Sequence, residues 1–319
     1  MSRPYDRRMS PTAFRRLALV TTLVLAAIVV TGGAVRLTNS GLGCPTWPRC
    51  TATSYVAPTS YHALVEFVNR MITVGVSVLV GVTFLGAVLR RPRRVDLTLG
   101  AGGLVLGVAG QAVIGGLSVI YKLSPGWVMA HFLVSMLVVW NAIVLYRRAD
   151  PDWAPGLPLL VRPELVWLGR LLAATAGLVL VLGTFVTGAG PHSGAPHAAR
   201  LHLPLERVTQ LHADAALFLT GLVVATAFAL RIAGAPAHVR RRAHWLLGLL
   251  GVQVAVGYAQ YFLDLPPGLI IVHIACATAL WLAVLWLNLG FTTPVAVEPV
   301  GARAVRNPGA GVPREARAR

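Results

Sequence analysis

The sequence predicts an all-α membrane protein with eight transmembrane helices, arranged as two tandem, pseudo-symmetric four-helix bundles. Hydrophobic residues make up 56% of the 319 residues and charged residues only 12%, about half of the roughly 25% typical of soluble domains. The apolar residues fall into windows of about 20, the length that crosses a bilayer as a helix. An internal repeat, described below, predicts the two bundles. The eight windows are 17–37, 64–89, 98–120, 127–146, 165–187, 209–230, 244–263 and 269–290.

The distribution of basic residues predicts how these helices are oriented. The net charge is +17, and most of the 28 basic residues lie in alternate connections, including RRPRR at 90–94 and RRR at 240–242. Because basic residues concentrate in cytoplasmic loops, both termini are expected inside, in a multi-pass protein of the cell membrane. The charge indicates topology and affinity for anionic membrane lipid, and no nucleic-acid partner is expected.

The first window, 17–37, also has the composition of a signal peptide. Its removal would invert the remaining helices against the charge pattern, so it is interpreted as the first helix, after a cytoplasmic segment at 1–16. The tail at 293–319 is rich in Pro, Gly, Ala and Arg and is expected to be a disordered cytoplasmic segment.

The loop after the first helix, GLGCPTWPRC, contains Cys44 and Cys50. We expect this loop on the oxidising side of the membrane, which favours a disulfide over free thiols. A metal clip is the other alternative, but two ligands are too few for structural zinc. Cys276, in the last helix, is expected to be a buried and unreactive thiol.

The second window opens with HALVEFVNRMIT, which places His62, Glu66, Asn69 and Arg70 at the entrance to an apolar helix. Ionisable groups are costly in hydrocarbon, so they are functional candidates by default. Glu66 and Asn69 are three residues apart and therefore share one face of the helix.

A repeat relates the third and fourth windows to the seventh and eighth. QAVIGGLSVIYKLSPGWVMAH aligns without a gap with QVAVGYAQYFLDLPPGLIIVH, pairing Gln111 with Gln253 and His131 with His273. A weaker similarity, between GGAVRLTNSG and GTFVTGAGPHSG, relates the first window to the fifth. The repeat predicts an N-terminal bundle at 17–148 and a C-terminal bundle at 165–292, joined by a cytoplasmic linker at 149–164.

Three histidines occupy comparable positions in this repeat. His131, His212 and His273 each lie a few residues past the outer end of an inward-running helix, so they are expected at similar depth. The residue of the second helix that corresponds to His212 is Asn69 or Arg70. Imidazoles that face each other across a bundle at one depth are typical of heme-iron ligation.

Zinc is the competing metal, because the loop GPHSGAPHAARLH adds His192, His197 and His202. These histidines are expected to face water, whereas heme suits an apolar bundle with few carboxylates. Arginines near the outer ends are candidate partners for heme propionates: Arg36, Arg49, Arg200 and Arg207.

Together these features resemble the heme A synthase family over essentially the whole membrane portion. The resemblance rests on GGAVRLTNSGLGCPTWPRC, EFVNR, QAVIGGLSV, GTFVTGAGPHSG and the histidines of the fourth, sixth and eighth helices. It implies two four-helix bundles and an oxidoreductase that converts the C8 methyl group of heme O to the formyl group of heme A, for cytochrome oxidase assembly. It also implies successive hydroxylations with water as the oxygen source, and a heme O synthase and an electron acceptor as partners.

Residue by residue, the resemblance implies that His212 and His273 are the axial ligands of a heme b cofactor in the C-terminal bundle. His131 corresponds to the axial ligand of the substrate heme in the N-terminal bundle. The heme sites are expected toward the outer face. The remaining matches are Glu66 as the catalytic acid, Arg70 as a candidate heme-binding neighbour, and Cys44 and Cys50 as the outer-loop pair.

Asn69 departs from the family pattern, in which many members have a histidine at this position. An iron held only by His131 keeps one face open, which suits chemistry on the bound heme. His62 lies on the same helix face but roughly 10 Å away along the axis. Glu66 is expected to stabilise a developing cation or to accept the proton of an attacking water. A structural hydrogen bond between helices is the alternative role for this acid.

Two other functions fit the same histidines. A di-heme electron carrier of the cytochrome b type would pass electrons without altering heme, and Glu66 would then be incidental. A heme transporter or chaperone would need a path to the inner side, whereas every histidine candidate is expected on the outer side. Only the enzyme would produce heme A.

Overall fold

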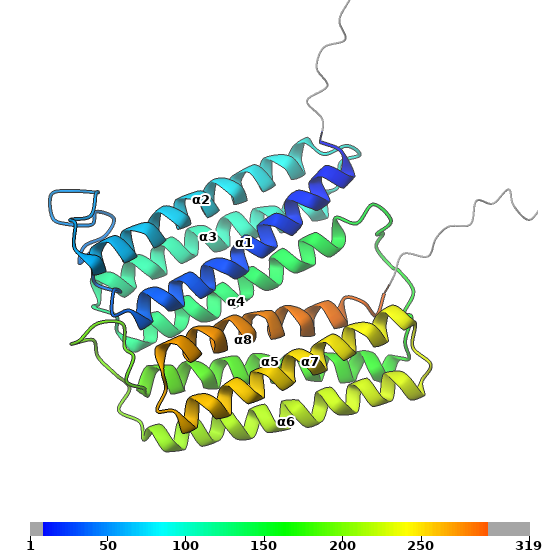
Figure 1. Ribbon diagram of the computed structural model, residues 1–319. Helices are drawn as coiled ribbons and strands as arrows, with labels where there is room; N and C mark the ends of the chain where they lie inside the picture. Colours follow the sequence, from blue (N-terminus) through cyan, green and yellow to red (C-terminus); the bar gives the residue numbers. More distant parts are fainter. Residues whose placement is uncertain (1–8, 293–319) are drawn as a thin grey trace, which may run out of the picture.

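The computed structural model describes residues 9–292, which form eight helices (Figure 1). Each is long and apolar enough to cross a membrane, so the prediction of an all-α membrane protein with eight transmembrane helices is confirmed. The expected disordered tail at 293–319 lies outside the described residues. In chain order the helices are α1 (Pro11–Leu37), α2 (Tyr61–Leu89), α3 (Val95–Ile120), α4 (Pro125–Arg148), α5 (Pro163–Ala189), α6 (Leu205–Ile232), α7 (Ala237–Phe262) and α8 (Pro267–Asn288).

Each helix begins two or more residues before the apolar window that predicted it. The first begins at Pro11 rather than at residue 17, because Ser10 caps it: the Ser10 Oγ accepts a hydrogen bond from the Ala13 N–H at 3.2 Å. Proline at the first helical position needs no backbone donor, which also favours this start. Hydropathy locates only the apolar part of a helix and misses such polar first turns.

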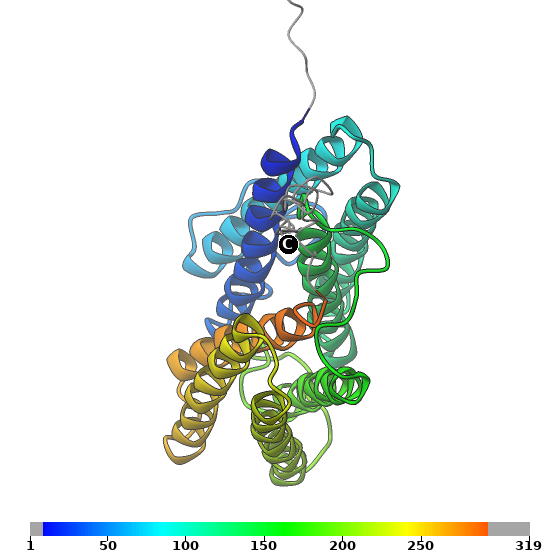
Figure 2. The ribbon, with the colours of Figure 1, turned by 90° about the vertical axis from the view of Figure 1, so that its right-hand side faces the viewer.

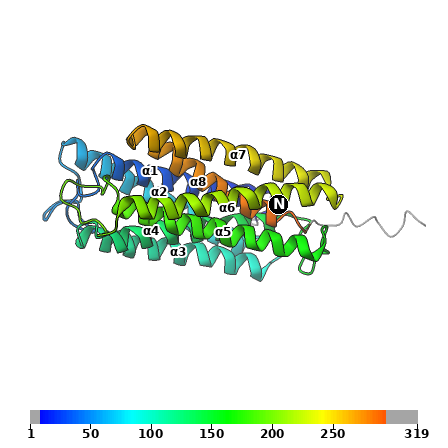
Figure 3. The ribbon, with the colours of Figure 1, turned by 90° about the horizontal axis from the view of Figure 1, so that it is seen from below.

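Each half of the chain forms a closed ring of four helices. In the N-terminal half, α1 and α3 each contact both α2 and α4, and in the C-terminal half α5 and α7 each contact both α6 and α8. The halves lie side by side, as the end-on view shows (Figure 2). They meet through α8, which contacts α1 and α4, and through α4 against α5 (Figure 3). The tandem duplication, the bundle boundaries and the cytoplasmic position of both termini stay predictions.

Two turns at repeat-related positions share an unusual backbone. Between α3 and α4, Lys122 and Leu123 have φ values of 48° and 60°, and between α7 and α8, Asp264 and Leu265 have φ values of 57° and 59°. Residues other than glycine rarely adopt this left-handed conformation. Its occurrence in both turns agrees with the ungapped alignment of the two segments.

The two ends of the bundle differ in character. The long loops 38–60 and 190–204 lie at one end, on the left in Figure 1, together with the two turns just described. We call this the loop end. The opposite end, where α1 begins, carries the arginine clusters 90–94, 147–148 and 240–242, and we call it the basic end. In the predicted orientation these are the outer and inner ends.

Candidate heme sites

The C-terminal half brings two predicted ligands together. His212 on α6 and His273 on α8 have ring centroids 6.3 Å apart, with their planes at 55°. Bonds between a histidine nitrogen and a metal are about 2.0–2.1 Å, and each ring centre lies about 1.2 Å behind its nitrogen, so axial imidazoles on one iron have centroids about 6 Å apart. The observed separation therefore fits a heme iron held between these two side chains.

The surroundings of His212 orient its ring for such a bond. Its Nδ1 lies 3.1 Å from the Val179 carbonyl oxygen, which favours Nδ1–H as the donor and leaves Nε2 available as a ligand. Gly183 on α5 gives the ring its room, since a Cβ there would lie 3.1 Å from the His212 Cε1.

The ring of His273 contacts a glutamine that sequence reasoning paired by repeat but gave no role. The Gln253 side-chain nitrogen on α7 lies 3.0 Å from His273 Nε2. The Gln253 Oε1 and the His273 Nδ1 are buried without a hydrogen-bond partner, which is uncommon for such groups. Each of these two contacting side chains therefore has one unpaired atom. The two atoms are available to bond each other if the side chains rearrange when the imidazole binds a metal.

The N-terminal half repeats the contact between a glycine and a histidine, but its glutamine bonds other groups. Gly115 on α3 faces His131 on α4, where a Cβ would lie 3.1 Å from the His131 Cε1. Gln111 on α3 donates to the His131 carbonyl oxygen and to the Ser135 Oγ, each at 3.0 Å, rather than to the ring. At the position equivalent to Ser135 the C-terminal half has Ala277, which offers no hydroxyl, so Gln253 contacts the imidazole.

Asn69 has a partner of its own. Its Oδ1 accepts a hydrogen bond from the Thr31 hydroxyl on α1 at 2.8 Å. His62 is exposed, and its Nδ1 lies 3.1 Å from the Ser40 Oγ in the loop 38–60. This contact favours a role in holding the loop over a role as the missing ligand.

Glu66 is buried beneath the cysteine loop, with only 6% of its surface exposed. Its Oε2 accepts the Cys44 N–H at 2.7 Å, and its Oε1 accepts Arg70 Nη2 at 2.6 Å. Arg70 also donates to the backbone carbonyl oxygens of Cys44, Thr46 and Arg49. Glu66 and Arg70 thus form a latch that holds the loop on α2. The sequence placed both residues on this helix but did not reveal that the loop is their partner.

The cysteine loop is itself closed and packed on a second helix. Cys44 and Cys50 form the predicted disulfide. The Trp47 ring lies against Gly116 on α3, where a Cβ would approach its Cδ2 to 2.7 Å. Gly116 is next to Gly115, which faces the ring of His131. The loop therefore covers the loop end of the N-terminal half, between the latch on α2 and the glycines on α3.

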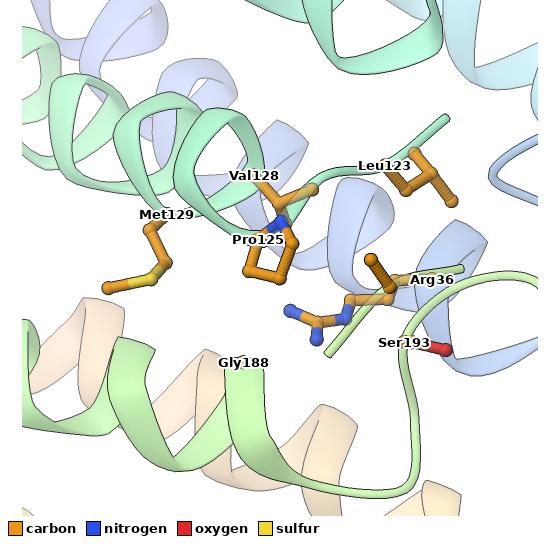
Figure 4. Close-up of a pocket in the computed structure, with 8 residues that line it drawn as sticks. Arg36, Leu123, Pro125, Val128, Met129, Gly188 and Ser193 are labelled. Carbon is orange, nitrogen blue, oxygen red and sulfur yellow. The ribbon is translucent and has the colours of Figure 1, made fainter. Parts of the chain in front are cut away.

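Arg36 occupies the junction of the two halves at the loop end. It donates from Nε to the His192 carbonyl oxygen and from Nη2 to the Thr187 carbonyl oxygen, both at 2.7 Å. Figure 4 shows its guanidinium reaching between Pro125 and Met129 of α4 and Gly188 of α5. No carboxylate of residues 9–292 lies within ion-pair distance of it. The other three predicted propionate partners lie at the same end: Arg49 and Arg200 bond backbone carbonyls, and Arg207 is exposed.

The histidine-rich loop does not assemble a metal site in the part of the chain that is described. His192 Nε2 lies 3.1 Å from the Leu265 carbonyl oxygen, and His197 and His202 are exposed. Within residues 9–292, no three or more His, Cys, Asp or Glu side chains are grouped so as to hold a metal ion.

Fold and site together define a multi-pass helical membrane protein with a pair of partly buried imidazoles between its helices. The chain belongs to the COX15-CtaA family, described as cytochrome oxidase assembly proteins, whose model matches residues 15–62 and 55–285. It is 30% identical to a heme A synthase of Symbiobacterium thermophilum, over 92% of this chain and 99% of that protein. It is 25% identical to a heme A synthase of Rhizorhabdus wittichii, over 92% and 98%. It also shares 28% identity with a protoheme IX farnesyltransferase of Thermus thermophilus, over 88% of this chain and 49% of that protein.

Proposed function

We propose that this protein is a heme A synthase, an oxidoreductase of the cell membrane that converts heme O to heme A for cytochrome oxidase assembly. Family membership and the similarity to proteins of that name over nearly their whole length support this activity. The observation that carries the proposal is the imidazole pair of His212 and His273, at the separation expected of two ligands on one iron. The imidazoles lie toward the loop end, which the charge pattern predicts to be outside.

The C-terminal half is proposed to hold heme b between His212 and His273. When bound, a bis-histidine heme supplies one-electron transfer. Metal-bound histidines almost always donate their second ring nitrogen to an oxygen acceptor. The Val179 carbonyl serves His212, and we assign the Gln253 side-chain oxygen to His273, since both that oxygen and the His273 Nδ1 are buried without partners.

The N-terminal half is proposed to bind the substrate heme through His131. Asn69 takes the place of a second imidazole and is held by Thr31, so the substrate iron has one firm ligand. Converting the methyl group to a formyl group consumes one water and releases four electrons and four protons, through successive hydroxylations. A heme b held by His212 and His273 would supply one-electron acceptance for this oxidation, with an electron acceptor as the further partner.

Glu66 is proposed to stabilise the cation that develops at the substrate methyl group or to accept a proton from the attacking water. Both of its oxygens are bonded to the loop and Arg70, so this role requires the latch to release one of them. Arg70 then remains to hold the loop through its contacts with backbone carbonyls.

Heme extraction from cells that express the protein with a source of heme O tests this proposal. Heme A should appear with the intact protein and be absent from cells with an empty vector. A protein that binds two hemes and transfers electrons, yet yields no heme A, would instead be a cytochrome b-type carrier. The Thermus relative, a longer protein named for farnesyl transfer to protoheme, supports a partnership with a heme O synthase.

A further inference from the structure

Two stacked aromatic rings lie between two arginines across four helices at the basic end. The Arg15 guanidinium (α1) lies 5.3 Å from the Tyr146 ring centre (α4), which stacks on Trp286 (α8) at 5.7 Å. At the other end of this series, the Arg242 guanidinium (α7) lies over Trp286, 4.0 Å from the ring centre. We call these four residues the basic-end ladder. It joins helices of both halves through cation–π and stacking contacts.

The two cations of the ladder differ in their partners. Arg15 pairs with Asp150 at 2.9 Å. Arg242 donates to the Trp286 carbonyl oxygen at 2.7 Å, but no carboxylate of residues 9–292 lies within ion-pair distance of it or of the exposed Arg241. Arg241 and Arg242, which are neighbours in a partly apolar setting, therefore lack a counter-charge such as the one that Asp150 provides for Arg15.

A pocket of about 350 Å³ opens beside these two arginines, between α7 and α8. Its end nearest the helix termini is basic, while its wall deeper in the span is apolar. Trp245 lies one turn after Arg241 in α7 and is 73% exposed. Ala283 lies one turn before Trp286 in α8, which runs toward the basic end, so both residues lie deeper than the arginines. The pocket thus changes from cationic to apolar along the expected membrane normal. Its lining residues are His238, Arg241, Arg242, Trp245, Ala283 and Trp286.

We propose that this pocket binds an anionic phospholipid, with its phosphate at Arg241 and Arg242 and an acyl chain along Trp245 and Ala283. Arginine presents a planar fork that matches phosphate oxygens, and stacking on Trp286 holds the Arg242 fork in place. Basic pockets between transmembrane helices on the cytoplasmic side are suited to anionic headgroups. The lipid would supply the missing counter-charge and brace α7 against α8, independently of the heme chemistry.

The test uses the full-length protein in nanodiscs of phosphatidylcholine, with or without phosphatidylglycerol, followed by native mass spectrometry and thermal unfolding. The wild-type protein should retain phosphatidylglycerol and unfold at a higher temperature when it is present. The double variant Arg241→Gln/Arg242→Gln should bind it on the order of tenfold more weakly. The matched control is Arg231→Gln/Arg240→Gln, which removes the same charge at the same end but outside the pocket. It should behave like the wild-type protein.

Three results would overturn the proposal. Equal losses in the pocket and control variants would indicate general surface charge rather than a site. Equal stabilisation by inorganic phosphate in phosphatidylcholine nanodiscs would indicate a soluble anion. The single variant Arg241→Gln guards against a folding defect, because Arg241 makes no hydrogen bond or ion pair within residues 9–292. Unchanged phosphatidylglycerol binding by this folded variant would exclude the assigned phosphate position.

Discussion

The two halves have the same pattern of helix contacts but differ in the side chains that are proposed to face heme. In the C-terminal half, imidazoles from α6 and α8 lie 6.3 Å apart between their centroids. In the N-terminal half, the corresponding helices α4 and α2 carry His131 and Asn69, and the asparagine is bonded to α1. A full pair of axial ligands suits electron transfer, whereas a single ligand leaves a face open. In the proposed function, this difference at one position distinguishes the cofactor site from the reaction site.

The coverings of the two sites differ as well. The loop over the N-terminal half is closed by the Cys44–Cys50 disulfide and latched by Glu66 and Arg70. The loop over the C-terminal half is held mainly by backbone carbonyls, including that of His192, which accepts from Arg36. The half proposed to exchange substrate and product therefore has a covering fixed by a disulfide, an ion pair and the bonds of Arg70 to backbone carbonyls.

Removing either imidazole of the C-terminal pair should have the largest effect. His212→Ala and His273→Ala should each abolish the low-spin heme b signal, because the iron loses one of two axial ligands. Absorption and electron paramagnetic resonance spectra of the purified variants measure this. His62→Ala, which removes an exposed histidine bonded to the loop, should keep the signal. A normal bis-histidine spectrum in either ligand variant would show that the ligands are misassigned.

Glu66→Gln should lower heme A formation by about a hundredfold, because the variant loses charge and basicity at nearly constant volume. The heme b spectrum should be unaffected, and heme O or its hydroxylated intermediate should accumulate. Chromatography of extracted hemes measures the products. Arg70→Gln is the matched control, because it removes the same ion pair and leaves the carboxylate.

The two variants separate chemistry from loop anchoring. If the carboxylate acts on the substrate, Arg70→Gln should retain much more activity than Glu66→Gln. Equal losses would reduce Glu66 to an anchor for the cysteine loop. Near-normal heme A from Glu66→Gln would remove the acid from the mechanism altogether.

Variants of Asn69 should have smaller effects than the variants above, and they test the difference between the two halves directly. Asn69→His should restore a second imidazole opposite His131, produce a six-coordinate substrate heme and slow turnover several-fold. Asn69→Ala should do less, because in this proposal His131 supplies the only firm bond. Heme coordination by resonance Raman spectroscopy, together with heme A yield, measures both. A complete loss of activity in Asn69→Ala at normal protein level would make the amide itself essential.

The sequence predicted the helices, the disulfide and the closeness of His212 to His273 because each depends on a local or repeated pattern. Apolar length gives the spans, and the ungapped repeat pairs His131 with His273. It did not predict that Glu66 and Arg70 bond the loop or that Gln253 bonds an imidazole. Such contacts depend on how each helix is rotated about its axis and on where a loop folds back. The alignment pairs Gln111 with Gln253. This pairing, together with their position facing the helices that carry the histidines, is the signal that could have identified them as neighbours of the candidate ligands.

The smallest expected effect concerns these glutamines. Gln253→Leu should leave heme b bound but shift its midpoint potential by tens of millivolts, because the iron-bound imidazole loses its hydrogen-bond acceptor. The direction should be upward, since a less basic imidazole stabilises ferric iron less well. Gln253→Glu should shift the potential downward by supplying a charged acceptor. Gln111→Leu is the matched control: its amide bonds the His131 carbonyl and Ser135 rather than a ring, so the heme b potential should not change. Redox titration followed by absorption measures each shift, and identical potentials in all four proteins would exclude Gln253 as the partner of His273.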